Sequence, residues 1–201
     1  MEPNGAMPQL GVPMPAEYRY YGYTQPKPPG GLAIAAALLI GLVAVTDVLS
    51  AAANLTGQFG QELRMVSIGF LATIVAAVLF ITWLWRVRSN VDAVVGPQTQ
   101  RLGKGWAIGA WICPIVSYWF PYQYVIDVWR ASSPDRAAAG NGLVLFWWLT
   151  FLLSNQLSLL LRLASTRTPW LGLVGDALQL AAAVLAILVI RRITAWQTGR
   201  P

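Results

Sequence analysis

Four long apolar stretches constrain this chain more than any other feature. Each is about as long as the roughly 20 residues that a helix needs to cross the hydrocarbon core of a bilayer. A soluble protein of 201 residues has too little interior to bury four such helices on every side. We therefore predict an all-α membrane protein with four transmembrane helices, at residues 32–53, 65–85, 143–163 and 170–190.

The few charges inside these stretches do not prevent insertion. They are Asp47, Arg162 and Asp176. In the fourth stretch, eleven Leu, Ile and Val residues contribute about −5 kcal/mol to insertion, which outweighs the cost of roughly 3 kcal/mol for one aspartate.

The segment between the second and third stretches has a different character. Residues 106–120 are apolar but too short for an ordinary span, and Pro114 at their centre removes a backbone donor and breaks a helix. Without a crossing here, eleven basic residues lie on one side of the membrane and three on the other. The positive-inside rule then favours cytoplasmic termini, with 106–120 as a central re-entrant or interfacial segment. The alternative is a fifth span.

Composition divides the chain into three parts. Residues 1–30 are rich in proline and tyrosine, without helical or strand periodicity, and are expected to form a disordered tail. Residues 31–192 form the helical membrane domain, and 193–201 a short cytoplasmic tail. Residues 122–132 have an amphipathic helical pattern.

Several short motifs carry a resemblance to a known family. They are Trp85-Arg86-Val87-Arg88-Ser89-Asn90, Gly105-Trp106-Ala107-Ile108-Gly109, Cys113-Pro114-Ile115-Val116, Pro121-Tyr122-Gln123 and Asp127-Val128-Trp129-Arg130-Ala131-Ser132. In order and spacing they resemble the bacterial membrane proteins of domain of unknown function 4328, over about residues 32–190. Ser117 stands where the resemblance leads us to expect asparagine. The resemblance implies a fold and a bacterial inner-membrane location but no reaction.

Basic and aromatic residues gather beside the central segment. Arg86, Arg88, Lys104 and Arg130 are expected near the cytoplasmic surface together with tryptophans. Such residues commonly anchor a protein at the headgroup level. The sharper interpretation is a site for anionic lipid or phosphate, because arginine can grip a phosphate with two parallel hydrogen bonds.

Four polar residues form a second candidate site within the bilayer: Asp47, Asn155, Arg162 and Asp176. Ionisable residues at such depth are costly unless they are paired. One interpretation is a buried ion pair between Asp176 and Arg162 that joins two neighbouring helices. The alternatives are ion or proton passage and side chains that reach up to the interface.

Catalysis finds little support in the sequence. The chain has no histidine and one cysteine, and it shows no phosphate-binding glycine loop or metal-ligand cluster. We expect no enzyme, cofactor or metal site, and no nucleic-acid partner. The expected role is a structural or regulatory membrane module with a basic-aromatic cytoplasmic platform, binding membrane lipids and open to a protein partner or a homo-oligomer. The alternative is a small transporter or channel component that uses the Asp/Asn layer.

Overall fold

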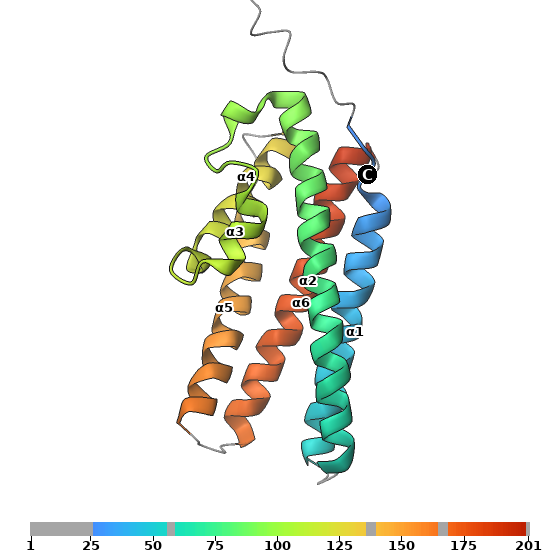
Figure 1. Ribbon diagram of the computed structural model, residues 1–201, viewed down its shortest axis with the longest axis vertical. Coiled ribbons are helices and arrows are strands. Elements are labelled where there is room, and N and C mark those ends of the chain that lie inside the picture. Colours follow the sequence, from blue (N-terminus) through green and yellow to red (C-terminus); the bar gives the residue numbers. More distant parts are fainter. Residues whose placement is uncertain (1–25, 56–58, 136–139, 165–168, 200–201) are drawn as a thin grey trace, which may run out of the picture.

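The computed structural model describes residues 26–55, 59–135, 140–164 and 169–199. In these residues every regular element is a helix (Figure 1). The long helices are α1 (Gly30–Leu55), α2 (Phe59–Val95), α5 (Gly142–Leu163) and α6 (Pro169–Thr198). Two shorter helices, α3 (Trp106–Ile112) and α4 (Phe120–Ser132), and the 3-10 turns η2 (Pro97–Thr99) and η3 (Val116–Tyr118) lie between α2 and α5 in the sequence.

The four predicted spans are confirmed as helices that are long and apolar enough to cross a membrane. They cover Gly30–Ala53, Gly69–Val95, Gly142–Leu163 and Trp170–Thr198. Large apolar side chains are exposed along all four, as expected where the surroundings are lipid rather than water, for example Leu38, Phe70, Leu160 and Val184.

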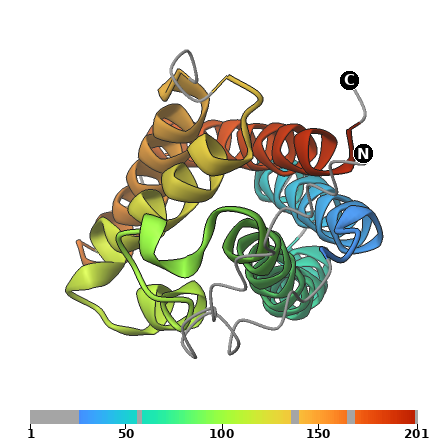
Figure 2. The same cartoon turned by 90° about the horizontal axis from the view of Figure 1, so that it is seen from above.

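The long helices form a row in which each hairpin contributes two members. α1 packs along α2 and along α6, and α6 packs along α5. α2 and α5 are therefore the outer helices of the row. Seen from above, α3 and α4 occupy the space between them (Figure 2). α1 begins at the same end of the bundle at which α2 and α6 end (Figure 1), and we call this the basic end because of the residues described below.

Residues 106–120 do not form a fifth span. α3 has only seven residues, and its last residue is followed by Cys113 in an extended conformation (φ −78°, ψ 112°), the conformation that a following proline imposes. The second proline, Pro121, lies in the first turn of α4, where its missing N–H is not needed. The five-span alternative is therefore wrong.

The predicted amphipathic helix is confirmed as α4. Its residues Val125, Ile126 and Trp129 are buried, and α4 packs against α2, α5 and α6. This short helix thus ties the basic ends of three spans together.

The limits of the membrane domain differ from those expected. Residues 193–198, expected in a tail, continue α6. Ile193 is fully buried, and the ring of Trp196 packs edge-on against that of Trp129, with centroids 4.6 Å apart. Helix α1 begins at Gly30, close to the expected start. The greater part of the proline- and tyrosine-rich segment lies outside the described residues.

Candidate functional site

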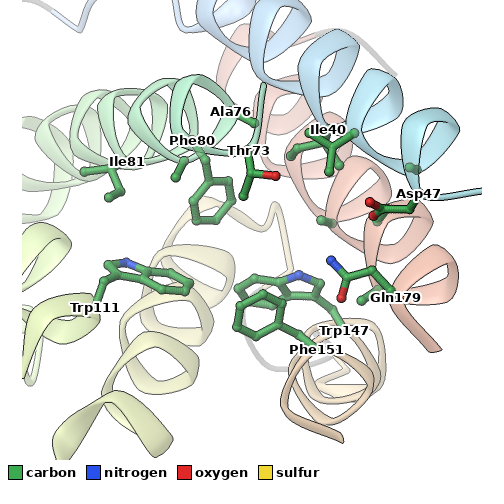
Figure 3. A pocket seen from close by; sticks show the side chains of 16 residues that line it. Ile40, Asp47, Thr73, Ala76, Phe80, Ile81, Trp111, Trp147, Phe151 and Gln179 are labelled. Atoms are coloured by element: carbon green, nitrogen blue, oxygen red, sulfur yellow. The ribbon is translucent and has the colours of Figure 1, made fainter. Parts of the chain in front are cut away.

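An apolar cavity of about 250 Å³ lies between the two long hairpins (Figure 3). Helices α1, α2, α5 and α6 supply its walls, and Trp111 of α3 closes one side. Alanines keep the space open where the helices approach one another: Ala44, Ala76, Ala77, Ala182, Ala183 and Ala186.

Aromatic rings form one end of this cavity. The ring of Phe80 lies 5.8 Å from that of Trp111 and 6.0 Å from that of Trp147, measured between centroids. Trp111 also meets Phe151 edge-on at 6.1 Å. The four rings come from α2, α3 and α5, so the α3 segment completes a wall that the spans alone leave open.

Polar groups face the other end. Asp47, half-buried on α1, directs its carboxylate into the cavity, and the amide nitrogen of Gln179 on α6 points toward the same space (Figure 3). The amide oxygen of Gln179 accepts a hydrogen bond of 2.8 Å from the buried Ser154 hydroxyl. The indole nitrogen of Trp147, a residue only 4% exposed, also faces the cavity (Figure 3). The cavity thus offers N–H donors and one carboxylate inside an apolar wall.

Only one of the four polar residues predicted from the sequence lines this cavity. That residue is Asp47. Asn155 is exposed and donates its amide to the backbone carbonyl of Phe151 at 2.7 Å. Arg162 and Asp176 are both exposed, and they form no ion pair within the described part of the chain. The expected buried pair is therefore wrong.

The sequence reasoning missed Gln179, Ser154 and Trp147. A signal was available for the first of these. Gln179 is the only amide in the fourth apolar stretch, and it lies one helical turn after Asp176. Which residue of that helix faces the cavity depends on how α6 packs against α1, and this cannot be read from one helix alone.

The basic residues singled out in the sequence separate into two groups. Arg88 is 1% exposed and lies inside the protein. Its Nε donates to the Asp92 carboxylate at 2.8 Å, and its guanidinium lies 5.3 Å from the centre of the Tyr124 ring. Burial raises the pKa of the Tyr124 hydroxyl, which therefore stays neutral and donates to the backbone carbonyl of Lys104 at 3.3 Å. Arg88 connects α2 with the α3–α4 region and is not a surface residue.

The other three reach the surface to different degrees. Lys104 places its ammonium 4.8 Å from the centre of the Trp85 ring. Arg130 is exposed, and its Nε donates to the side-chain oxygen of Asn141 at 3.2 Å. Arg86 is half-buried. These contacts link Lys104 to the end of α2 and Arg130 to the residue before α5, rather than joining the cations in one cluster.

A buried network explains much of the motif that carries the family resemblance. Asn90 is buried and forms two hydrogen bonds of 2.9 Å with the backbone of Lys27, one as acceptor and one as donor. Its amide also donates to Gln197, which in turn donates to the Val87 carbonyl and the Ser132 hydroxyl. These bonds join α2, α4 and α6 to the segment before α1.

A second cavity, of about 300 Å³, opens at the same end of the bundle. Its lining includes Trp129, Ser133, Arg192 and Trp196. Arg192 lies over the Trp196 ring at 5.4 Å. The indole N–H of Trp129 is buried without a hydrogen-bond partner among the described residues. Asp135 also lines this cavity, so it combines an exposed cation and an unpaired indole donor with an acidic side chain.

No group of three or more metal-ligating side chains occurs among the residues that the structure describes. In comparisons with known proteins, the sequence model of the family described as Domain of unknown function (DUF4328) matches residues 44–195. No curated protein and no solved structure matches the chain.

Proposed function

The chain belongs to the DUF4328 family, and from its geometry we propose that it is a structural or regulatory membrane module that binds anionic lipid headgroups at the basic end of its helical bundle. The family description supplies no activity, so the proposal rests on the protein's own residues. We further propose that the protein lies in a bacterial inner membrane, with the basic end in the cytoplasm.

The observation that carries the proposal is the separation of basic side chains along the bundle. Of the basic side chains that the structure describes, only Arg162 lies at the end opposite the basic end. Those at the basic end are Lys27, Arg86, Arg88, Arg101, Lys104, Arg130, Arg191 and Arg192. Each basic residue near an anionic membrane surface contributes roughly 1 kcal/mol to attraction.

Several of these cations lie beside aromatic rings, as interfacial anchors do. Lys104 lies over Trp85, which is 39% exposed, and Arg192 lies over Trp196. Arg101 is not free to bind lipid in the same way, because it grips the Asp127 carboxylate with two nitrogens at 2.6 and 3.0 Å. The lipid-binding set therefore consists of Arg86, Lys104, Arg130 and the arginines at the end of α6.

The proposal includes a re-entrant position for the α3–α4 region. Trp111 of α3 contacts Phe80 and Phe151, which lie within two of the spans. A segment that reaches those residues from the basic end enters the apolar layer while its neighbours shelter its backbone. Its basic flanks would then lie at the headgroup plane.

A transport function is less well supported. A transport path needs polar groups through the full depth of the bilayer, whereas the polar groups of the cavity between the two long hairpins lie at one end and aromatic rings form the other. We propose no catalytic role.

Native mass spectrometry of the full chain tests the proposal. The wild type should retain phosphatidylglycerol in preference to phosphatidylcholine. The triple variant Arg86→Gln, Lys104→Gln, Arg130→Gln should lose about 3 kcal/mol of headgroup attraction, and its preference should fall at least tenfold. Arg162→Gln, at the opposite end, is the matched control and should retain the wild-type preference. Equal retention of both lipids by the wild type would overturn the proposal.

A further inference from the structure

We propose that the cavity between the two long hairpins binds a small organic cation, an amine with a compact apolar or aromatic body, with Asp47 as its counter-ion. This inference concerns the cavity of about 250 Å³ and does not depend on lipid binding at the basic end.

The carboxylate of Asp47 has no basic partner among the described residues. Asp47 lines the cavity, and its carboxylate lies near enough to that of Asp176 for the two to repel each other. No described basic side chain forms an ion pair with either of them. A carboxylate inside a membrane span is costly unless a partner offsets it. A cation in the cavity would supply that partner.

The chemistry of the cavity walls selects the kind of cation. A metal ion needs several oxygen, nitrogen or sulfur ligands around it, but the walls here are mainly alanine, aliphatic and aromatic side chains. Aromatic faces and a carboxylate together are the usual surroundings of an organic ammonium group. The rings of Phe80, Trp147 and Phe151 would contact the ligand's apolar body while Asp47 binds its charge (Figure 3).

The volume of the cavity limits the size of the ligand. A cavity of roughly 150 Å³ lined by apolar residues accepts benzene, so one of about 250 Å³ accepts a ligand of about ten non-hydrogen atoms by proportion. An amine with a single ring is of that size. A folded lipid with two acyl chains is not.

The experiment measures the binding of 2-phenylethylamine to the full chain in nanodiscs by isothermal titration calorimetry. The matched neutral probe is 2-phenylethanol, which has the same shape and no charge. The amine should bind at least about tenfold more tightly than the alcohol, because its charge meets a partly desolvated carboxylate. Asp47→Asn, which keeps the shape of the side chain, should remove this difference.

Two further variants separate a binding defect from a folding defect. Asp176→Asn changes the neighbouring exposed acid, which does not line the cavity, and should retain most of the preference for the amine. Ala183→Leu narrows the cavity and leaves Asp47 unchanged, so it should weaken the binding of both probes. Circular dichroism and size exclusion must show that each variant keeps the wild-type fold.

The remaining outcomes overturn the proposal. Equal binding of amine and alcohol would indicate a cavity for neutral lipid chains. Unchanged amine binding in Asp47→Asn would place the cation elsewhere. Concentration-dependent dimerisation that Ala183→Leu abolishes, with no binding of either probe, would assign the cavity to a second copy of the chain.

Discussion

The ion pair between Arg88 and Asp92 should behave as a buried structural pair and not as part of a lipid-binding surface. Arg88 is 1% exposed and its partner 17%. Removing one member of a buried pair leaves the other charge uncompensated and costs 3 to 5 kcal/mol in fully buried cases. Because Asp92 keeps some contact with solvent, we expect Asp92→Ala to lower the free energy of unfolding by about 3 kcal/mol.

The double variant tests whether the two charges stabilise the protein as a pair. Arg88→Met replaces the guanidinium with an apolar chain of similar length, so Arg88→Met combined with Asp92→Ala leaves no buried charge. We expect the double variant to be at least 1.5 kcal/mol more stable than the sum of the two single losses predicts. Unfolding in mixed micelles of dodecyl maltoside and sodium dodecyl sulfate measures all three free energies.

A pair whose arginine is exposed to solvent provides the control. Arg101 and Asp127 form an ion pair in which the arginine side chain is 54% exposed and the aspartate 10%, so removing the aspartate leaves a solvated guanidinium. Asp127→Ala should cost less than about 1 kcal/mol. Additive losses in the Arg88 and Asp92 double variant, or an Asp92→Ala loss as small as that of Asp127→Ala, would refute the structural role of Arg88.

Two further predictions concern pH and topology. Burial raises the pKa of Tyr124, so above about pH 10 the hydroxyl is ionised in the unfolded chain but not in the folded chain. The free energy of unfolding should therefore fall by up to about 1.4 kcal/mol per pH unit above that pH. Tyr124→Phe should reduce this fall. In a Cys113→Ala background, an impermeant maleimide applied to intact cells should modify Leu163→Cys but neither Thr99→Cys nor Thr198→Cys. Modification of Thr198→Cys but not of Leu163→Cys would show that the protein has the opposite orientation in the membrane.

The spans were predictable because each apolar stretch carries its own evidence. Length and hydropathy are local properties, and a helix that satisfies its own backbone needs no partner to cross a bilayer. The interruption at Pro114 was predictable for the same reason, since the lost N–H and the steric demand on Cys113 are fixed by adjacent residues. The number of spans followed from these local facts.

The burial of Arg88 was harder to predict because its charge suggests a surface position. The periodicity nevertheless held the information. Leu84 and Val91 are buried, and Arg88 lies on the same helical face, four residues after the first and three before the second. The sequence could not show which residues pack over this face of α2. Tyr124, which packs there, belongs to α4, and the position of α4 depends on its contacts with three spans.

The end of α6 shows a related limit. Ile193, Trp196 and Gln197 follow two arginines, and from the sequence we predicted a tail beginning at residue 193. The structure continues the helix because these residues meet partners on α2 and α4: Gln197 bonds to Val87 and Ser132, and Trp196 meets Trp129. A helix that leaves the bilayer can continue where another element buries its apolar side.

The basic end and the cavity between the two long hairpins have one structural cause. The proline-broken α3–α4 region fills the space between α2 and α5 (Figure 2), and Trp111 of α3 forms part of the cavity wall. The alanines of α1, α2 and α6 hold the hairpins close without filling the space between them. Larger side chains there would recover dispersion contacts and remove the cavity. The same arrangement therefore concentrates cations at one end of the bundle and leaves, deeper in the spans, an apolar space whose only carboxylate among the lining residues is Asp47.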